Sequence, residues 1–185
     1  GAGWLEREGR ADEEDTAALL AKLDLQPGQT VADLGCGSGY YSRRMATAVG
    51  PEGTVFAVDI QPEMLRILRE LAAREGISNI VPVQSQEDDP YLPEGEIDWI
   101  LLVDVYHELQ QPEPMLAAMR EALAPGGRIA LVEYRLEGDS ARHIKLDHRM
   151  SPTQVLAEWE PAGFELVELW EGLPTQHLFI FQAAE

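Results

Sequence analysis

The 185-residue sequence contains very little cysteine and lysine. Cys36 is the only cysteine, which excludes an internal disulfide and a metal site built from several cysteines. Lys22 and Lys145 are the only lysines, so arginine supplies almost all of the positive charge. No apolar run approaches the roughly 18 residues that a membrane span needs. These absences predict a cytoplasmic protein with no membrane partner.

Positive charge of any kind is scarce. The chain has 14 Lys and Arg residues and 33 Asp and Glu residues, which gives a net charge of −19. A chain so acidic repels polyanions and lacks the electrostatic attraction on which nucleic-acid binding depends. The acidic residues are spread along the whole chain, which is more typical of a solvated surface than of a site for a cationic substrate. We therefore expect no nucleic-acid partner.

Short apolar runs alternate with helical patterns along most of the chain. The length predicts a single domain, over residues 24–185, preceded by an N-terminal segment, 1–23, that carries one amphipathic helix over Asp12–Lys22. The expected strands are Thr30–Leu34, Thr54–Asp59, Ile80–Gln84, Ile97–Asp104, Arg128–Tyr134, Phe164–Trp170 and His177–Phe181, and the expected helices are Tyr40–Val49, Pro62–Glu75, Glu113–Leu123 and Pro152–Ala162.

The repeated strand–helix order predicts a doubly wound α/β fold with helices on both faces of a seven-stranded sheet. Five strands should be parallel. The connection Glu171–Thr175 is too short for a helical crossover, so the last two strands should form an antiparallel pair. Arg135–Ser151 is the longest irregular stretch, and such loops are usually functional or mobile.

A glycine-rich loop follows the first expected strand. Gly35, Gly37 and Gly39 would let the backbone approach a ligand that a Cβ would repel. A dinucleotide-binding fingerprint would need its third glycine at position 40, where this chain has Tyr40. The spacing therefore argues against a nucleotide-linked oxidoreductase, which stays open as the less favoured alternative. Cys36 has no flanking base in this loop, and we expect it to fill tight space rather than act as a nucleophile.

Asp59 ends the second expected strand and supports binding of a nucleoside. A carboxylate at this point can accept hydrogen bonds from both hydroxyls of a ribose. A glycine loop alone is a weak signal, because many strand-to-helix turns contain glycine. The combination of loop and carboxylate is more specific.

Together with these motifs, the segments around Asp98 and around Pro125-Gly126-Gly127 stand in a characteristic order. Here the chain resembles the class I S-adenosylmethionine-dependent methyltransferases, from about Asp24 to Phe181. The resemblance implies a Rossmann-like fold, S-adenosylmethionine as cofactor, S-adenosylhomocysteine as product and a small-molecule acceptor. A module that binds the donor without catalysis is the main alternative.

The resemblance also implies where the donor lies. It places Asp33 and Gly35 near the methionine end and Asp104 next to the amino group. It places Asp59 on the ribose, and the segment after Asp59 near the adenine. The residues implied in that segment and further on are Ile60, Met64, Glu87 and Asp88, with Glu87 and Asp88 as alternatives. In many such enzymes the segment before the core folds over the donor, so residues 1–23 are a candidate lid, with a frayed terminus as the equal alternative.

The turn after the fourth strand should line the acceptor side, because it lies beside the glycine loop at the carboxyl edge of the sheet. Histidine titrates near neutrality, so His107 could take a proton from the acceptor, with Tyr106 or Glu108 orienting it. A turn histidine that caps the next helix is the structural alternative. Asp104 and Glu133 with His107 or His148 could hold a divalent ion, but carboxylates at strand ends are common, and we expect no metal site.

Overall fold

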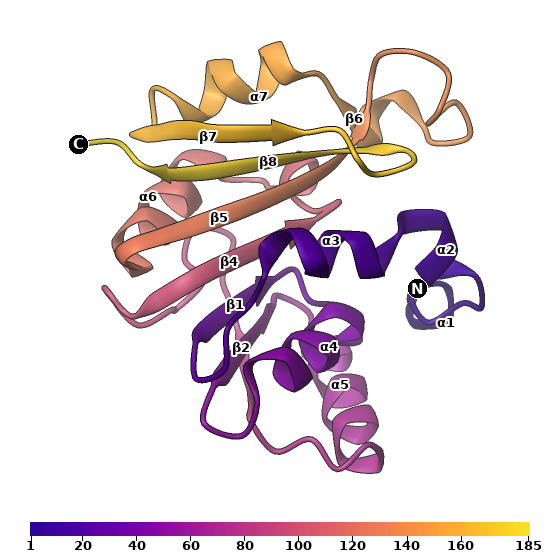
Figure 1. Ribbon diagram of the computed structural model, residues 1–185, viewed down its shortest axis with the longest axis vertical. Helices are drawn as coiled ribbons and strands as arrows, with labels where there is room; N and C mark the ends of the chain where they lie inside the picture. Colours follow the sequence, from indigo (N-terminus) through magenta and orange to yellow (C-terminus); the bar gives the residue numbers. More distant parts are fainter.

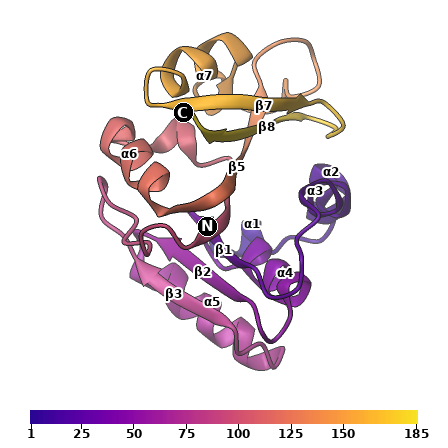
Figure 2. The same cartoon turned by 60° about the vertical axis from the view of Figure 1, so that its left-hand side comes forward.

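The computed structural model describes residues 1–185, and its centre is a mostly parallel sheet. The strands lie in the order β3-β2-β1-β4-β5-β8-β7 (Figure 1; β3 is labelled in Figure 2). The strands are β1 Thr30–Leu34, β2 Thr54–Asp59, β3 Ile80–Gln84, β4 Ile97–Val103, β5 Leu123–Arg135, β6 Arg149–Met150, β7 Phe164–Trp170 and β8 Gln176–Ala183.

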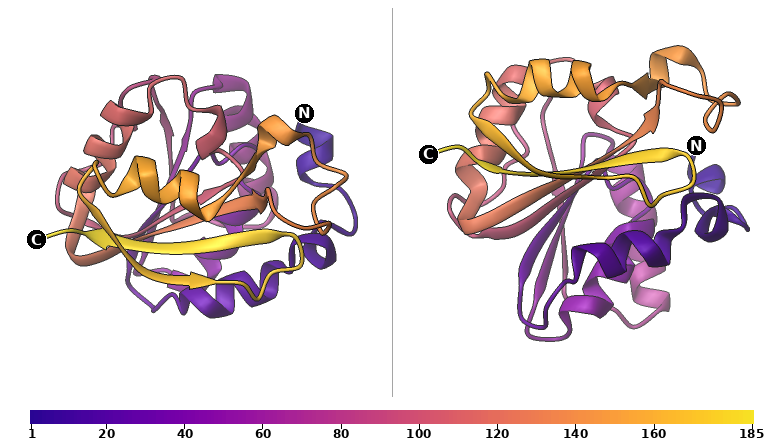
Figure 3. Two further views of the ribbon diagram at one scale, coloured as in Figure 1. Left: turned by 90° about the horizontal axis from the view of Figure 1, so that it is seen from above. Right: turned by 45° about the horizontal axis from the view of Figure 1, so that its top comes forward.

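The pairing confirms the predicted doubly wound fold. The first five strands are mutually parallel, while β8 pairs antiparallel with both β5 and β7. The short strand β6 was not predicted; it extends the end of β5 in parallel, with Tyr134 opposite Arg149. β8 lies between β5 and β7, and its end places the C-terminus far from the N-terminal segment (Figure 3).

Helices cover both faces of the sheet (Figure 2). One face is covered by α3, α4 and α5, and the other by α6 and α7, whose apolar stripes enter separate cores. The helices are α1 Ala2–Leu5, α2 Arg10–Glu14, α3 Thr16–Leu23, α4 Tyr40–Val49, α5 Pro62–Arg74, α6 Pro112–Ala122 and α7 Pro152–Trp159, with short 3₁₀ helices η1 Tyr106–Glu108 and η2 Leu146–His148.

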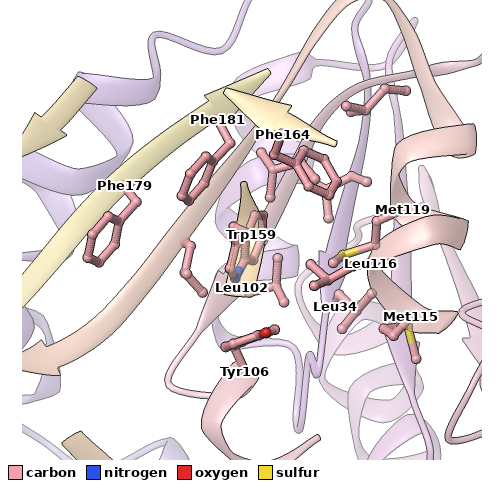
Figure 4. Packing of buried hydrophobic residues seen from close by; sticks show 14 of the residues in the cluster. Leu34, Leu102, Tyr106, Met115, Leu116, Met119, Trp159, Phe164, Phe179 and Phe181 are labelled. Atoms are coloured by element: carbon pink, nitrogen blue, oxygen red, sulfur yellow. The ribbon is translucent and has the colours of Figure 1, made fainter. Parts of the chain in front are cut away.

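The core beneath α6 and α7 is the larger and is rich in aromatic rings (Figure 4). Trp159 is fully buried and stacks on Phe181, with ring centroids 4.5 Å apart. Tyr106 points into this core, with its ring 5.4 Å from that of Trp159. This aromatic core packs against β4 and β5 on the face of the sheet that α6 and α7 cover.

The prediction of one helix over Asp12–Lys22 was wrong. The chain forms two helices, α2 and α3, separated by Asp15 in the left-handed region at φ +47°. The Asp15 carboxylate accepts the backbone N–H of Ala18 at 3.2 Å and so caps α3. The break turns α2 toward the carboxyl edge of the sheet. No helix of this fold has the length and hydrophobicity of a membrane-spanning segment.

Candidate active site

A cavity of about 760 Å³ opens at the carboxyl ends of β1, β2, β4 and β5. It lies within the size range of about 300–1,000 Å³ that is typical of small-molecule sites. The N-terminal segment and the segment after β5 both lie at this edge of the sheet (Figures 1 and 3). The lining includes Trp4, Leu5, Arg10, Tyr40, Tyr41 and Tyr134, with residues 33–37, 59–61, 85–87, 103–105, 107–110, 143–145 and 148.

The glycine loop after β1 forms one wall. Gly35 and Gly37 lie in the left-handed region, at φ +74° and +53°. A Cβ on Gly35 would come within 2.5 Å of the side chain of Val105, so the loop and the β4 turn are in close contact. Gly39 does not line the cavity; a Cβ there would meet Leu68 of α5 at 2.7 Å. The structure therefore gives Gly39 a packing role rather than the predicted contact with a ligand.

Asp59 ties the glycine loop to the end of β2. One carboxylate oxygen accepts the backbone N–H of Gly37 at 2.8 Å, and the other accepts that of Gln61 at 2.8 Å. Each oxygen keeps a second lone pair for a ligand hydroxyl. The predicted pair of glycine loop and carboxylate is thus a single hydrogen-bonded unit.

Two further carboxylates lie deeper in the cavity. Burial raises the pKa of Asp33 to about 6, although the Ser42 hydroxyl donates to it at 2.6 Å and Arg10 lowers its pKa. Burial also raises the pKa of Asp104, with contributions from the charges of Glu133 and Glu14. One Asp104 oxygen accepts a hydrogen bond from Gln176 at 2.7 Å, while the other, Oδ1, is buried and has no partner.

Arg10 faces these carboxylates, a role that we did not predict from the sequence. Its guanidinium donates to Glu14 at 3.0 Å and lies 4.2 Å from the centre of the Tyr40 ring. Glu14 also accepts the hydroxyl of Tyr41 at 2.9 Å. The i, i+4 spacing of Arg10 and Glu14 was visible, but their burial depends on the unpredicted break at Asp15.

The segments that follow β2 and β3 line another part of the cavity. Ile60 and Met64 both line it, and Ile60 is an exposed large apolar side chain. Of the two acidic alternatives in the turn after β3, Glu87 lines the cavity and Asp88 does not.

Cys36 also lines the cavity, but it is not a reactive thiol. Burial raises its pKa well above the usual range, and the charges of Asp33 and Asp59 raise it further. A thiol that stays protonated is a poor nucleophile. This placement agrees with the interpretation of Cys36 as a small residue that fills tight space.

His107 projects from η1 into the cavity and is held from behind by Glu133. Its Nδ1 lies 2.7 Å from Glu133 Oε2, and its backbone N–H donates to Oε1 at 3.3 Å. Burial lowers the pKa of His107, but the hydrogen bond and charge of Glu133, with the charges of Glu108 and Asp147, outweigh it and raise the pKa overall. His148 from η2 completes this wall, with its Nδ1 3.0 Å from His107 Nε2.

Tyr106 does not join this wall. Its hydroxyl donates to Glu158 of α7 at 2.7 Å, and its side chain is buried in the aromatic core rather than lining the main cavity (Figure 4). The predicted role of Tyr106 in orienting an acceptor does not fit this placement. The ion-binding set that we considered, Asp104 and Glu133 with a histidine, is not gathered either, because Glu133 is engaged with His107.

A doubly wound sheet with a glycine loop and a carboxylate at its carboxyl edge is typical of proteins that bind a nucleoside-containing cofactor. Comparison with known proteins identifies the class as that of the class I S-adenosylmethionine-dependent methyltransferases. A family model described as a methyltransferase domain matches residues 25–176. The chain therefore belongs to this methyltransferase family and is an S-adenosylmethionine-dependent enzyme.

Several relatives can be compared directly. A methyltransferase of known structure from Aquifex aeolicus is 25% identical, with a TM-score of 0.88 over 97% of this chain and 95% of its own. The ubiquinone/menaquinone biosynthesis C-methyltransferase UbiE of Cupriavidus taiwanensis is 28% identical over 80% of this chain and 72% of its own length. A protein-L-isoaspartate O-methyltransferase from Aeropyrum pernix is 34% identical, but over only 61% of this chain and 42% of its own.

Proposed function

We propose that the chain transfers a methyl group from S-adenosylmethionine, bound along the glycine loop, to a small molecule held against η1 and η2. The observation that carries this proposal is that the glycine loop, Asp59 and His107 line one and the same cavity. A donor and an acceptor in one cavity can be aligned for direct displacement, and alignment supplies much of the rate of such a reaction.

The residues present fit the donor. Asp59 offers free lone pairs for ribose hydroxyls, and Ile60 and Met64 offer apolar surface for a base. The unpartnered Oδ1 of Asp104 would accept a hydrogen bond from an ammonium group, as Asp33 would. Arg10 is the nearby cation for a carboxylate. When bound, S-adenosylmethionine supplies an electrophilic methyl group.

The acceptor side is the wall of η1 and η2. Because Glu133 contacts Nδ1 of His107, Nε2 is the ring nitrogen that faces His148, and both rings line the cavity. We assign to His107 the contact with the acceptor, either by taking its proton or by binding it through another group.

The similarity to the C-methyltransferases supports a carbon acceptor in a small organic molecule. A phenol or enol fits this chemistry, because ionisation of its oxygen makes the neighbouring carbon nucleophilic. Tag-free protein, S-adenosylmethionine and a panel of phenols, enols and amines would be incubated together, and S-adenosylhomocysteine would be measured. We expect turnover with at least one phenol or enol and little with the amines.

The alternative of a donor-binding module without catalysis makes a different prediction in the same assay. Such a protein would bind S-adenosylmethionine by calorimetry but would yield no S-adenosylhomocysteine above the rate without enzyme. This result across the whole panel would contradict the proposed transfer while leaving donor binding in place.

A further inference from the structure

Three potential metal ligands meet on the acceptor wall. They are Nε2 of His107, Nδ1 of His148 and a carboxylate oxygen of Glu108, and all of them lie within 4.8 Å of one another. His107 and Glu108 come from η1 and His148 from η2, so two separate turns converge here.

One of the three separations equals that of ligands around one cation, and the other two are a few tenths of an ångström longer. His107 Nε2 is 3.0 Å from His148 Nδ1 and 3.8 Å from Glu108 Oε1, and His148 Nδ1 is 3.7 Å from the same oxygen. Ligand atoms about 2.1 Å from a shared cation lie about 3.0–3.4 Å apart in octahedral or tetrahedral geometry. A movement of a few tenths of an ångström at the exposed Glu108 side chain would complete the set.

The partners of the two rings leave one nitrogen of each facing the other. The fully buried Glu133 lies 2.7 Å from Nδ1 of His107, so Nε2 is the nitrogen left for a ligand. On the other ring, the Asp147 carboxylate lies 3.8 Å from Nε2 of His148, and Nδ1 lies 3.0 Å from His107 Nε2. A proton or a cation between these two nitrogens would join them.

A carboxylate behind a metal-binding histidine is a common feature of metal sites, because it fixes the ring and increases its basicity. Glu133 is so placed behind His107. His148 and Glu108 are partly exposed, at 40% and 61% of their side chains, so a cation could reach them from solvent. All three ligands line the main cavity, which leaves the remaining coordination positions open toward an acceptor.

We infer that His107, His148 and Glu108 bind a divalent transition-metal ion whose open positions take an oxygen of the methyl acceptor. Two imidazoles and one carboxylate suit Zn²⁺, Fe²⁺, Co²⁺ or Ni²⁺, whereas Mg²⁺ and Ca²⁺ prefer sites made only of oxygen ligands. The net charge of −19 further favours cations near the surface.

This inference rests on the proposed function for its acceptor but not for its metal. With the ion in place, His107 is a ligand and does not itself take the proton. A phenol or enol oxygen bound to the ion would be ionised more easily, because the positive charge stabilises the anion. The His107 contact with the acceptor would then be made through the ion.

The test uses Co²⁺ as the probe on tag-free protein that has been freed of metal with a chelator. Co²⁺ is added stepwise, and its visible absorption is recorded with an excess of Mg²⁺ present. We expect saturation at one equivalent in the wild type. His148→Ala and Glu108→Gln should each weaken Co²⁺ binding at least tenfold. His143→Ala is the matched control, since His143 lines the same cavity outside the cluster, and its Co²⁺ affinity should equal that of the wild type.

Absence of saturable Co²⁺ binding in the wild type would overturn the inference, and the pair would then be a shared-proton hydrogen bond. Equal affinity in His148→Ala, or displacement of Co²⁺ by Mg²⁺, would overturn it too. Calorimetry with S-adenosylmethionine on the same samples separates the two proposals. Donor binding without a Co²⁺ site contradicts only the metal, and a Co²⁺ site without donor binding contradicts only the proposed function.

Discussion

Asp33 is a buried residue whose charge should make the free protein less stable. Burial raises its pKa to about 6, compared with about 3.9 in an unfolded chain. The folded protein therefore holds a proton that the unfolded chain has lost between about pH 4 and 6, and this contribution to stability disappears as the pH rises through 6. At pH 7.5 the carboxylate is ionised and buried, and a pKa about 2 higher than in the unfolded chain corresponds to a cost of about 3 kcal/mol.

Asp33→Asn should accordingly raise the free energy of unfolding at pH 7.5 by about 1–3 kcal/mol. The gain should shrink as the pH falls toward 5. Urea unfolding without ligand, at several pH values, measures this difference. Asp88→Asn, at an exposed site outside the cavity, should show no gain. A gain in stability for Asp33→Asn that grows toward low pH would contradict the raised pKa of Asp33.

His107 and its neighbour Tyr106 should behave differently despite their adjacency. His107→Ala should lower turnover about 100-fold or more, as expected for loss of a group that acts on the acceptor, with donor affinity changed less than about twofold. Tyr106→Phe should leave turnover unchanged, because its hydroxyl contacts Glu158 outside the cavity. Equal losses of donor affinity and turnover in His107→Ala would show that His107 has a structural role.

Among the elements, the N-terminal segment lies against the donor wall. Glu6 accepts the hydroxyl of Ser38 at 2.6 Å and pairs with Arg43 at 2.6 Å, and Leu5 lies where a Cβ of Gly37 would project. These contacts attach α1 to the glycine loop. We propose that the segment is a lid over the donor.

Glu6→Ala should release this lid and weaken S-adenosylmethionine binding by about threefold to tenfold, or about 0.7–1.4 kcal/mol. Faster dissociation should account for most of the change, as stopped-flow fluorescence of Trp4 would show. Glu8→Ala is the control, because Glu8 is exposed in the same segment. An unchanged dissociation rate in Glu6→Ala would contradict the proposal that the N-terminal segment is a lid over the donor.

The sequence predicted the elements whose apolar pattern is local. It missed features that depend on pairing with a distant part of the chain. The order of strands and helices followed from apolar periodicity. The prediction that Arg128 begins the fifth strand was wrong, because β5 starts at Leu123, which pairs with Ile97 of β4. Strand β6 consists of only two residues and exists through its pairing with β5. Such tertiary contacts leave no periodic signal in the chain.

The candidate site shows the same difference between features with a local pattern and features that depend on tertiary contacts. The glycine loop and Asp59 are consecutive motifs, and the structure joins them by a hydrogen bond. The sequence could not tell which of Tyr106 and His107 faces the cavity, because one residue of rotation in a 3₁₀ turn decides it. Nor could it place Glu133 behind His107, from which it is separated by 26 positions in the chain.

Across the whole molecule, the net charge of −19 should oppose folding through self-repulsion. Raising the ionic strength from about 0.01 M to 0.15 M shortens the screening length from about 30 Å to 8 Å. The melting temperature should rise by a few degrees, since 1 kcal/mol corresponds to about 2–4 °C at this size. Calorimetric scans in NaCl and KCl should agree. A melting temperature that falls with salt would show that favourable ion pairs outweigh the repulsion.

We place S-adenosylmethionine against the glycine loop and Asp59, and calorimetry with Asp59→Ala is the decisive measurement of this placement. We expect at least a tenfold loss of affinity, about 1.4 kcal/mol or more, relative to the wild type. Far-ultraviolet circular dichroism would confirm that the variant is folded, and Asp88→Ala should bind like the wild type. An Asp59→Ala protein with unchanged affinity would contradict the placement of the donor in this cavity.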